Sequence, residues 1–178
     1  MNMILLPGKS SKNKVWIEKI ETSFKTHYPL TFTLDYSHWE TENGDLNFEL
    51  ELEKLKNLAK EKDEIVIFAK SAGAILAMKA IFDKDIKPTA CIFAGTAVGW
   101  AQATQENFDS WLQDYSVPTL FIQKTSDPAI AAEDLNELLT DSNAQNYKLL
   151  EIPGDNHDYE DINLLVNSSL EFMNKLNL

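Results

Sequence analysis

The chain has 178 residues, of which 28 are acidic and 16 are basic, so its formal net charge at pH 7 is −12. All the basic residues are lysines. The absence of arginine removes the side chain that most often reads phosphate, carboxylate or guanine through two-point contacts. An acidic chain of this kind repels polyanions, so we expect no nucleic-acid partner.

Short apolar runs alternate with stretches of helical periodicity along the chain. The strand candidates are rich in Ile, Leu, Val and Phe, as expected for strands covered on both faces. They are Met3–Leu6, Thr31–Tyr36, Glu64–Phe68, Ala90–Ala94, Thr119–Gln123 and Lys148–Ile152. Helical spacing occurs over 15–24, 52–59, 74–82, 108–112, 135–139 and 164–173, and the start of the second helix, near Phe48, is ambiguous. This alternation predicts a three-layer α/β sandwich with about six mostly parallel strands and helices on both faces.

No internal repeat, low-complexity tract or linker divides the sequence, so we expect residues 1–178 to form a single domain. The only cysteine, Cys91, cannot form an internal disulfide, and no Cys/His pair has the spacing of a zinc site. The apolar run Met3–Leu6 is too short for a secretion signal. No segment approaches the ~18 apolar residues of a membrane-spanning helix. We therefore expect a cytoplasmic protein with no membrane span.

Gly8-Lys9-Ser10 follows the first predicted strand and ends like a phosphate-binding loop. Such a loop needs an earlier glycine, five residues before the second one, so that successive N–H groups can wrap the phosphates. Met3 occupies that position, inside the strand. A nucleotide site therefore has little support here.

A stronger pattern lies at Ser71, where a buried strand runs through small residues directly into a helix. A serine on such a turn is held with its hydroxyl above the end of the sheet. Small residues two positions before and after it let the strand and helix backbones approach closely, and Ala69 and Gly73 occupy those positions. The N–H groups at the start of the helix favour developing negative charge. Ser71 is therefore a candidate nucleophile, although small residues after a strand also mark tight packing.

Two later loops carry the groups that a serine nucleophile needs. Asp127 follows the strand Thr119–Gln123, and His157 follows the strand Lys148–Ile152. In a parallel sheet these loops open at the same carboxyl edge as the turn that holds Ser71. An imidazole can take the serine proton, while the carboxylate fixes the imidazole tautomer and stabilises the imidazolium. We predict that His157 Nε2 lies within hydrogen-bond distance of Ser71 Oγ, and that an Asp127 oxygen lies within that distance of His157 Nδ1.

On these residues the chain resembles the α/β-hydrolase superfamily over nearly its whole length. The nucleophile turn corresponds to residues 69–73, and the order Ser71, Asp127, His157 is that of the superfamily. The resemblance implies the strand order 2-1-3-4-5-6 and no metal or other cofactor. It also implies an oxyanion and substrate-binding site at Gly8, Lys9 and Ala72, with the backbone N–H groups of Lys9 and Ala72 as donors. Pro7-Gly8 stands where many members have His-Gly, and Ala69 replaces the usual first glycine of the turn.

Other residues compete for the same roles. Asp155 and Asp158 flank His157, but near neighbours in sequence seldom reach Nδ1 of the same ring. The loop after Ala90–Ala94, where some relatives keep the acid, has no carboxylate. We expect His27 and His38 to be ordinary surface histidines.

The sequence leaves no room for an inserted cap domain, because only about ten residues separate Ala94 from the next helical pattern. We expect an open cleft with Trp39 and Trp100 as candidate walls. The predicted function is a serine hydrolase that cleaves a small acyl ester through an acyl-enzyme. The alternative is a non-catalytic binding or interaction protein on the same fold.

Overall fold

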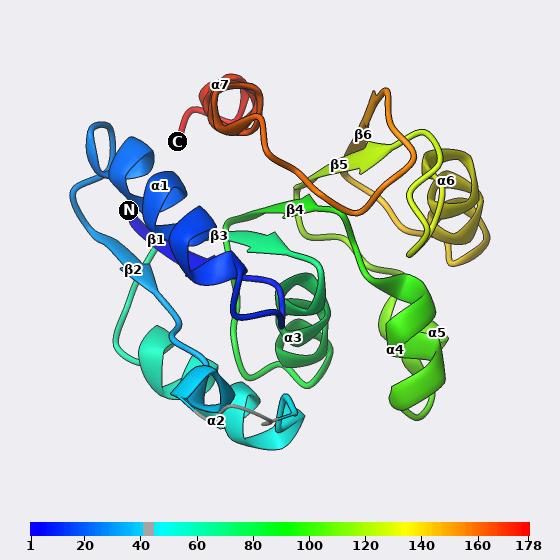
Figure 1. Cartoon of the computed structure of the whole chain (residues 1–178), viewed down its shortest axis with the longest axis horizontal. Helices are drawn as coiled ribbons and strands as arrows, with labels where there is room; N and C mark the ends of the chain where they lie inside the picture. The colour runs from blue at the N-terminus through cyan, green and yellow to red at the C-terminus, as the bar shows by residue number, and fades with distance from the viewer. Residues whose placement is uncertain (41–44) are drawn as a thin grey trace.

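The computed structural model describes residues 1–40 and 45–178. Its elements alternate between strand and helix from the N-terminus onward (Figure 1). In chain order they are β1 (Asn2–Leu6), α1 (Asn13–Lys25), β2 (Thr31–Thr33), the 3₁₀ helix η1 (Ser37–Glu40), α2 (Phe48–Ala59), β3 (Ile65–Lys70), α3 (Ala72–Phe82), β4 (Ala90–Ala94), α4 (Val98–Thr104), α5 (Phe108–Trp111), β5 (Thr119–Lys124), α6 (Ala132–Asp141), β6 (Tyr147–Ile152) and α7 (Ile162–Lys175).

The strands form one six-stranded sheet in the order β2-β1-β3-β4-β5-β6, and every neighbouring pair is parallel. This confirms the predicted strand order. The register places Leu6 opposite Ala69 and Lys70 opposite Ala94. The carboxyl ends of the central strands therefore lie at one edge of the sheet, where the loops that carry the candidate site residues emerge.

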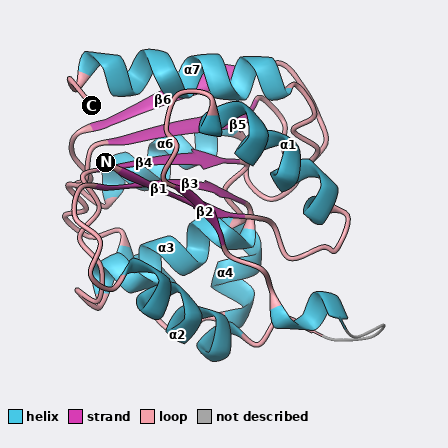
Figure 2. Cartoon of the chain, turned by 90° about the vertical axis from the view of Figure 1, so that its left-hand side faces the viewer, coloured by secondary structure: helices cyan, strands magenta, loops and turns pink. Residues whose placement is uncertain are grey.

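Helices cover both faces of the sheet (Figure 2). Alternate side chains of each strand enter different cores, as the two-residue period of a strand requires. In β1, Ile4 and Leu6 belong to the core that also contains residues of α2, α3 and α6, whereas Met3 and Leu5 belong to the core that contains residues of α1 and α7. The central strands are buried on both sides, which explains their uninterrupted apolar sequences.

The structure differs from the sequence expectation in two connections and resolves the ambiguous helix start. Helix α4 begins at Val98, where a loop was expected, and strand β2 ends at Thr33 rather than at Tyr36. Helix α2 begins at Phe48, because the Asn47 side chain accepts a hydrogen bond from the Leu50 N–H and caps it. No helix in the described ranges has the length and apolar character needed to cross a membrane.

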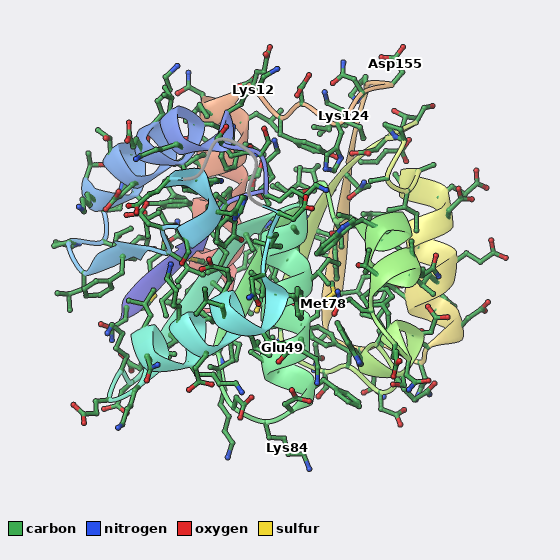
Figure 3. All side chains as sticks on the ribbon, turned by 60° about the horizontal axis from the view of Figure 1, so that its bottom comes forward. Lys12, Glu49, Met78, Lys84, Lys124 and Asp155 are labelled. Carbon is green, nitrogen blue, oxygen red and sulfur yellow. The ribbon has the colours of Figure 1, made fainter. Side chains whose placement is uncertain are left out.

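Different loops lie at the two edges of the sheet where the strands begin and end. In Figure 3, Lys124 and Asp155 lie at one end of the molecule, and Lys84 lies at the opposite end. Lys124 and Asp155 belong to the loops that follow β5 and β6, whereas Lys84 follows the end of α3. The candidate residues are therefore gathered at the carboxyl edge of the sheet.

Candidate active site

Ser71 occupies a sharp turn between β3 and α3. Its backbone has φ 54° and ψ −121°, a combination that L-residues adopt only under strain. The turn is tight because α3 approaches β1: a Cβ on Gly73 would lie 2.5 Å from the Leu6 carbonyl oxygen. Ala69 is fully buried in the sheet. Small residues at these two positions are therefore a packing requirement of the turn.

Asp127 and His157 come from the loops after β5 and β6. The two loops are joined by hydrogen bonds from the Thr125 N–H to the Ile152 carbonyl and from the Ser126 N–H to the Gly154 carbonyl, both 2.9 Å. Pairing of the loops extends the β5–β6 register beyond the strands. Asp127 and His157 are 30 residues apart in sequence, and this pairing brings their side chains together.

Three side chains form a continuous hydrogen-bond chain. His157 Nδ1 lies 2.8 and 3.0 Å from the Asp127 carboxylate oxygens, and His157 Nε2 lies 2.8 Å from Ser71 Oγ. An ionised carboxylate can only accept, so Nδ1 carries the proton. Nε2 is then the acceptor of the neutral ring and faces the serine hydroxyl. Since both ring nitrogens are engaged by Ser71 and Asp127, neither Asp155 nor Asp158 is the acid paired with this imidazole.

The Asp127 carboxylate is buried, at 3% exposure, and accepts hydrogen bonds from three residues. Besides His157, the Ala129 N–H donates to Oδ1 and the Tyr159 hydroxyl donates to Oδ2, each at 2.8 Å. Burial alone would raise the pKa of Asp127. The hydrogen bonds from His157, Ala129 and Tyr159 outweigh it and hold that pKa below its ordinary value. The carboxylate is therefore kept in its charged form.

The carbonyl groups of the loop after β1 are held by the segment that follows β2. The Tyr36 hydroxyl donates to the Pro7 carbonyl at 2.7 Å, and Trp39 Nε1 donates to the Lys9 carbonyl at 3.0 Å. His38 Nε2 donates to the same Lys9 carbonyl at 2.6 Å. His38, expected to be an ordinary surface histidine, thus contacts the candidate oxyanion loop. These bonds fix the Pro7–Gly8 and Lys9–Ser10 peptide groups, which lie on either side of the Gly8–Lys9 peptide.

Helix α1 holds the other side of the same loop. Asn13 Nδ2 donates to the Ser10 carbonyl at 3.1 Å, and Asn13 Oδ1 accepts from the buried Lys70 ammonium at 2.9 Å. A Cβ on Gly8 would lie 2.8 Å from Asn13 Nδ2 and 3.2 Å from Ser71 Cβ. The loop therefore passes directly beside Ser71, and a side chain at Gly8 would push it away.

The backbone N–H groups of Lys9 and Ala72, beside Ser71, have no hydrogen-bond acceptor within residues 1–40 and 45–178, and neither do those of Gly8 and Gly73. Ala72 is the first residue of α3, and the Ser71 side chain does not cap this helix. Both residues border a depression of about 310 Å³ together with Ser71 and His157. Its other wall residues are small or apolar: Ala97, Gly99, Trp100, Pro128 and Ala129. Among the described residues there is no cluster of His, Cys, Asp or Glu that could hold a metal ion.

No protein-family model and no curated protein sequence matches the chain. Solved structures do. Alpha/beta hydrolase domain-containing protein 10 from mouse superposes with a TM-score of 0.75 at 15% identity, over 98% of this chain and 90% of that one. Est1E from Butyrivibrio proteoclasticus, with bound ferulic acid, superposes with a TM-score of 0.74 at 18% identity, over 97% of this chain and 88% of Est1E. A serine hydrolase involved in carbazole degradation superposes with a TM-score of 0.73 at 13% identity, over 98% of this chain and 91% of that one. This chain has the α/β-hydrolase fold.

Within this α/β-hydrolase fold, the six residues selected from the sequence all lie around one point. Ser71, His157 and Asp127 are in direct contact, Gly8 packs against Ser71, and Lys9 and Ala72 border the same depression. Of the two tryptophans expected as cleft walls, Trp100 is one, whereas Trp39 instead supports the Lys9 carbonyl.

Sequence reasoning missed the residues that surround this centre. Tyr36, His38 and Asn13 bond the loop after β1, and Tyr159 bonds Asp127. Tyr159 carried a signal, because it lies two residues after His157 on the same loop. Tyr36 and Asn13 carried none, since each is a polar residue next to an ordinary strand or helix end.

Proposed function

We infer that this chain is a serine hydrolase that cleaves carboxylic esters, with Ser71 as nucleophile, His157 as general base and acid, and Asp127 as the acid of the triad. The hydrogen-bond chain Asp127–His157–Ser71 carries this proposal, because each contact has the direction that the chemistry needs. The strained backbone of Ser71 adds support, since strain of this kind accumulates at functional positions.

In the acylation step, Ser71 Oγ attacks the ester carbonyl carbon while its proton passes to His157 Nε2. The carbonyl oxygen becomes an oxyanion and accepts hydrogen bonds from the N–H groups of Lys9 and Ala72. Asp127 stabilises the imidazolium. The tetrahedral intermediate collapses when its C–O bond to the alcohol breaks, and the departing oxygen takes the proton from Nε2. An acyl group now remains on Ser71 Oγ.

Deacylation repeats these events with water. Nε2 takes a proton from the water as its oxygen attacks the acyl carbon, and the same two N–H groups stabilise the second oxyanion. The bond to Ser71 Oγ then breaks, Oγ regains its proton from Nε2, and a carboxylic acid leaves. Nothing is oxidised or reduced, and the reactants are the ester and one water molecule. The depression of about 310 Å³ and its apolar walls favour a small, uncharged acyl group.

Covalent labelling tests the proposal most directly. A fluorophosphonate reacts readily only with an activated serine, so we expect one phosphonyl adduct per chain, located at Ser71 by mass spectrometry. Ser71→Ala should abolish the label. Ser110→Ala, which removes an exposed serine hydroxyl that donates to the Asn107 carbonyl, should retain it. A wild-type chain that stays unlabelled while folded would contradict the hydrolase and favour a non-catalytic binding protein.

The oxyanion donors make a separate prediction. Lys9→Pro deletes the Lys9 N–H and should lower kcat by about 10²–10³-fold, the usual effect of losing one such donor. Lys9→Ala is the matched control, because it removes the side chain at the rim of the depression but keeps the N–H. Turnover of a short-chain activated ester, measured alongside circular dichroism, compares the two. If folded Lys9→Pro turns over as fast as Lys9→Ala, this N–H is not an oxyanion donor.

A further inference from the structure

A tyrosine outside the predicted triad touches its acid. The Tyr159 hydroxyl donates to Asp127 Oδ2 at 2.8 Å and accepts from the Lys124 backbone N–H at 2.9 Å. Tyr159 is 2% exposed and does not border the depression beside Ser71. Its ring also packs edge-to-face against the His157 ring, with the centroids 6.1 Å apart, but its hydroxyl reaches the reacting groups only through Asp127.

The fold places Tyr159 by contacts on three sides. Its ring lies against Gly95 at the end of β4, where a Cβ would come within 2.4 Å of the tyrosine Cε2. Trp16 Nε1, from α1, donates to the Tyr159 carbonyl at 2.6 Å. The Lys124 ammonium lies 5.2 Å from the ring centroid. The hydroxyl is thus held at a defined point rather than on a mobile loop.

The Lys124 side chain ties the same assembly to the histidine loop. Its ammonium donates to the Asn156 side chain at 2.7 Å and to the Asp158 carbonyl, the residues on either side of His157. Its aliphatic stem crosses Gly154, where a Cβ would lie only 2.6 Å from the lysine Cδ. Lys124 and Tyr159 therefore connect the loop of the acid to the loop of the base.

We propose that Tyr159 is a positioning residue for catalysis: its hydroxyl orients the Asp127 carboxylate toward His157 Nδ1 and keeps it ionised. This inference rests on the proposed function. A carboxylate with two free oxygens can rotate, and the bonds from Tyr159 to Oδ2 and from Ala129 to Oδ1 fix both. The hydroxyl cannot readily ionise instead, because burial and the adjacent Asp127 charge raise the pKa of Tyr159.

Tyr159→Phe keeps the ring against Gly95 and removes only the hydroxyl. We expect kcat to fall about tenfold, the usual scale for one hydrogen bond to a charged group, with KM unchanged because Tyr159 does not line the depression. The acid limb of the kcat/KM profile should also move to higher pH. A carboxylate that has lost a hydrogen-bond donor is harder to ionise, so the pKa of Asp127 should rise in the variant.

Tyr115→Phe is the matched control, because it deletes another buried tyrosine hydroxyl, one bonded to Thr119 Oγ1 away from the depression. It should leave kcat and the acid limb unchanged. Lys70, which interacts electrostatically with Asp127, and the charged groups that act on Lys70, namely Lys124, Asp158 and Glu160, are the same in both variants. A shift confined to Tyr159→Phe therefore reports the hydroxyl.

Two further measurements cover a variant that folds poorly. In the Asp127→Asn background, Tyr159→Phe should cause little further loss, because Tyr159 acts through Asp127. Carbon-13 titration of the Asp127 carboxyl should show a higher pKa in Tyr159→Phe than in the wild type, whatever the turnover. If the wild type shows Ser71-dependent turnover but Tyr159→Phe retains its kcat and acid limb, the inference alone is wrong. A wild type without Ser71-dependent turnover overturns the proposed function and this inference together.

Discussion

Ser71→Ala is expected to reduce turnover of a short-chain activated ester by about 10⁵–10⁶-fold, the scale on which removal of a serine nucleophile acts in a comparable triad. The reason is geometric. Ser71 Oγ is the hydroxyl that His157 Nε2 contacts, at 2.8 Å, and the uncapped start of α3 lies directly behind it. An alanine methyl group fits the same turn, so the fold should persist with a change in unfolding free energy of about 1 kcal/mol.

The measurement is kcat/KM with an activated ester such as p-nitrophenyl acetate, in the presence and absence of a chelator. Surface lysines can cleave such esters slowly, so the comparison of variants matters more than the wild-type rate. Ser110→Ala should behave like the wild type, and the chelator should have no effect. If Ser71→Ala keeps the wild-type rate, the serine hydrolase proposal is wrong, whatever the label experiment shows.

Asp127→Asn is expected to reduce turnover by about 10⁴-fold, as in the best-studied triad. The amide lacks the negative charge that stabilises the imidazolium. It also presents an NH₂ group to a site where His157, Tyr159 and Ala129 all donate. At least one of these donors loses its acceptor, which disfavours the tautomer that leaves Nε2 free to accept the serine proton.

Asp155→Asn is the matched control for this variant. Asp155 is an exposed acid two residues before His157, and its replacement should leave kcat/KM unchanged. Thermal unfolding should show that both variants are folded. The outcome that contradicts the assignment is the reverse order of effects, with Asp155→Asn inactive and Asp127→Asn active.

Much of the architecture could be predicted from local sequence pattern. Strands β3 and β4 read as continuous apolar runs because both of their faces are buried, and alternation with helical periodicity indicated a parallel sheet. Helix α4 was not predicted because its seven residues, Val98–Thr104, make only about two turns, which is too short for a helical period to emerge. Strand β2 was predicted too long, because Tyr36 continues the apolar run but leaves the sheet to bond the Pro7 carbonyl.

The sequence by itself determined which residues could form the candidate site. Ser71, Asp127 and His157 each follow a predicted strand, and in a parallel sheet all strands end at the same edge, so connectivity alone brings these side chains together. Only the tertiary structure decided what orients them. Tyr159 on Asp127, and Tyr36 and Trp39 on the loop after β1, are contacts between segments far apart in the chain. A local pattern records the period with which side chains are buried, and a hydrogen bond between distant loops leaves no period to detect.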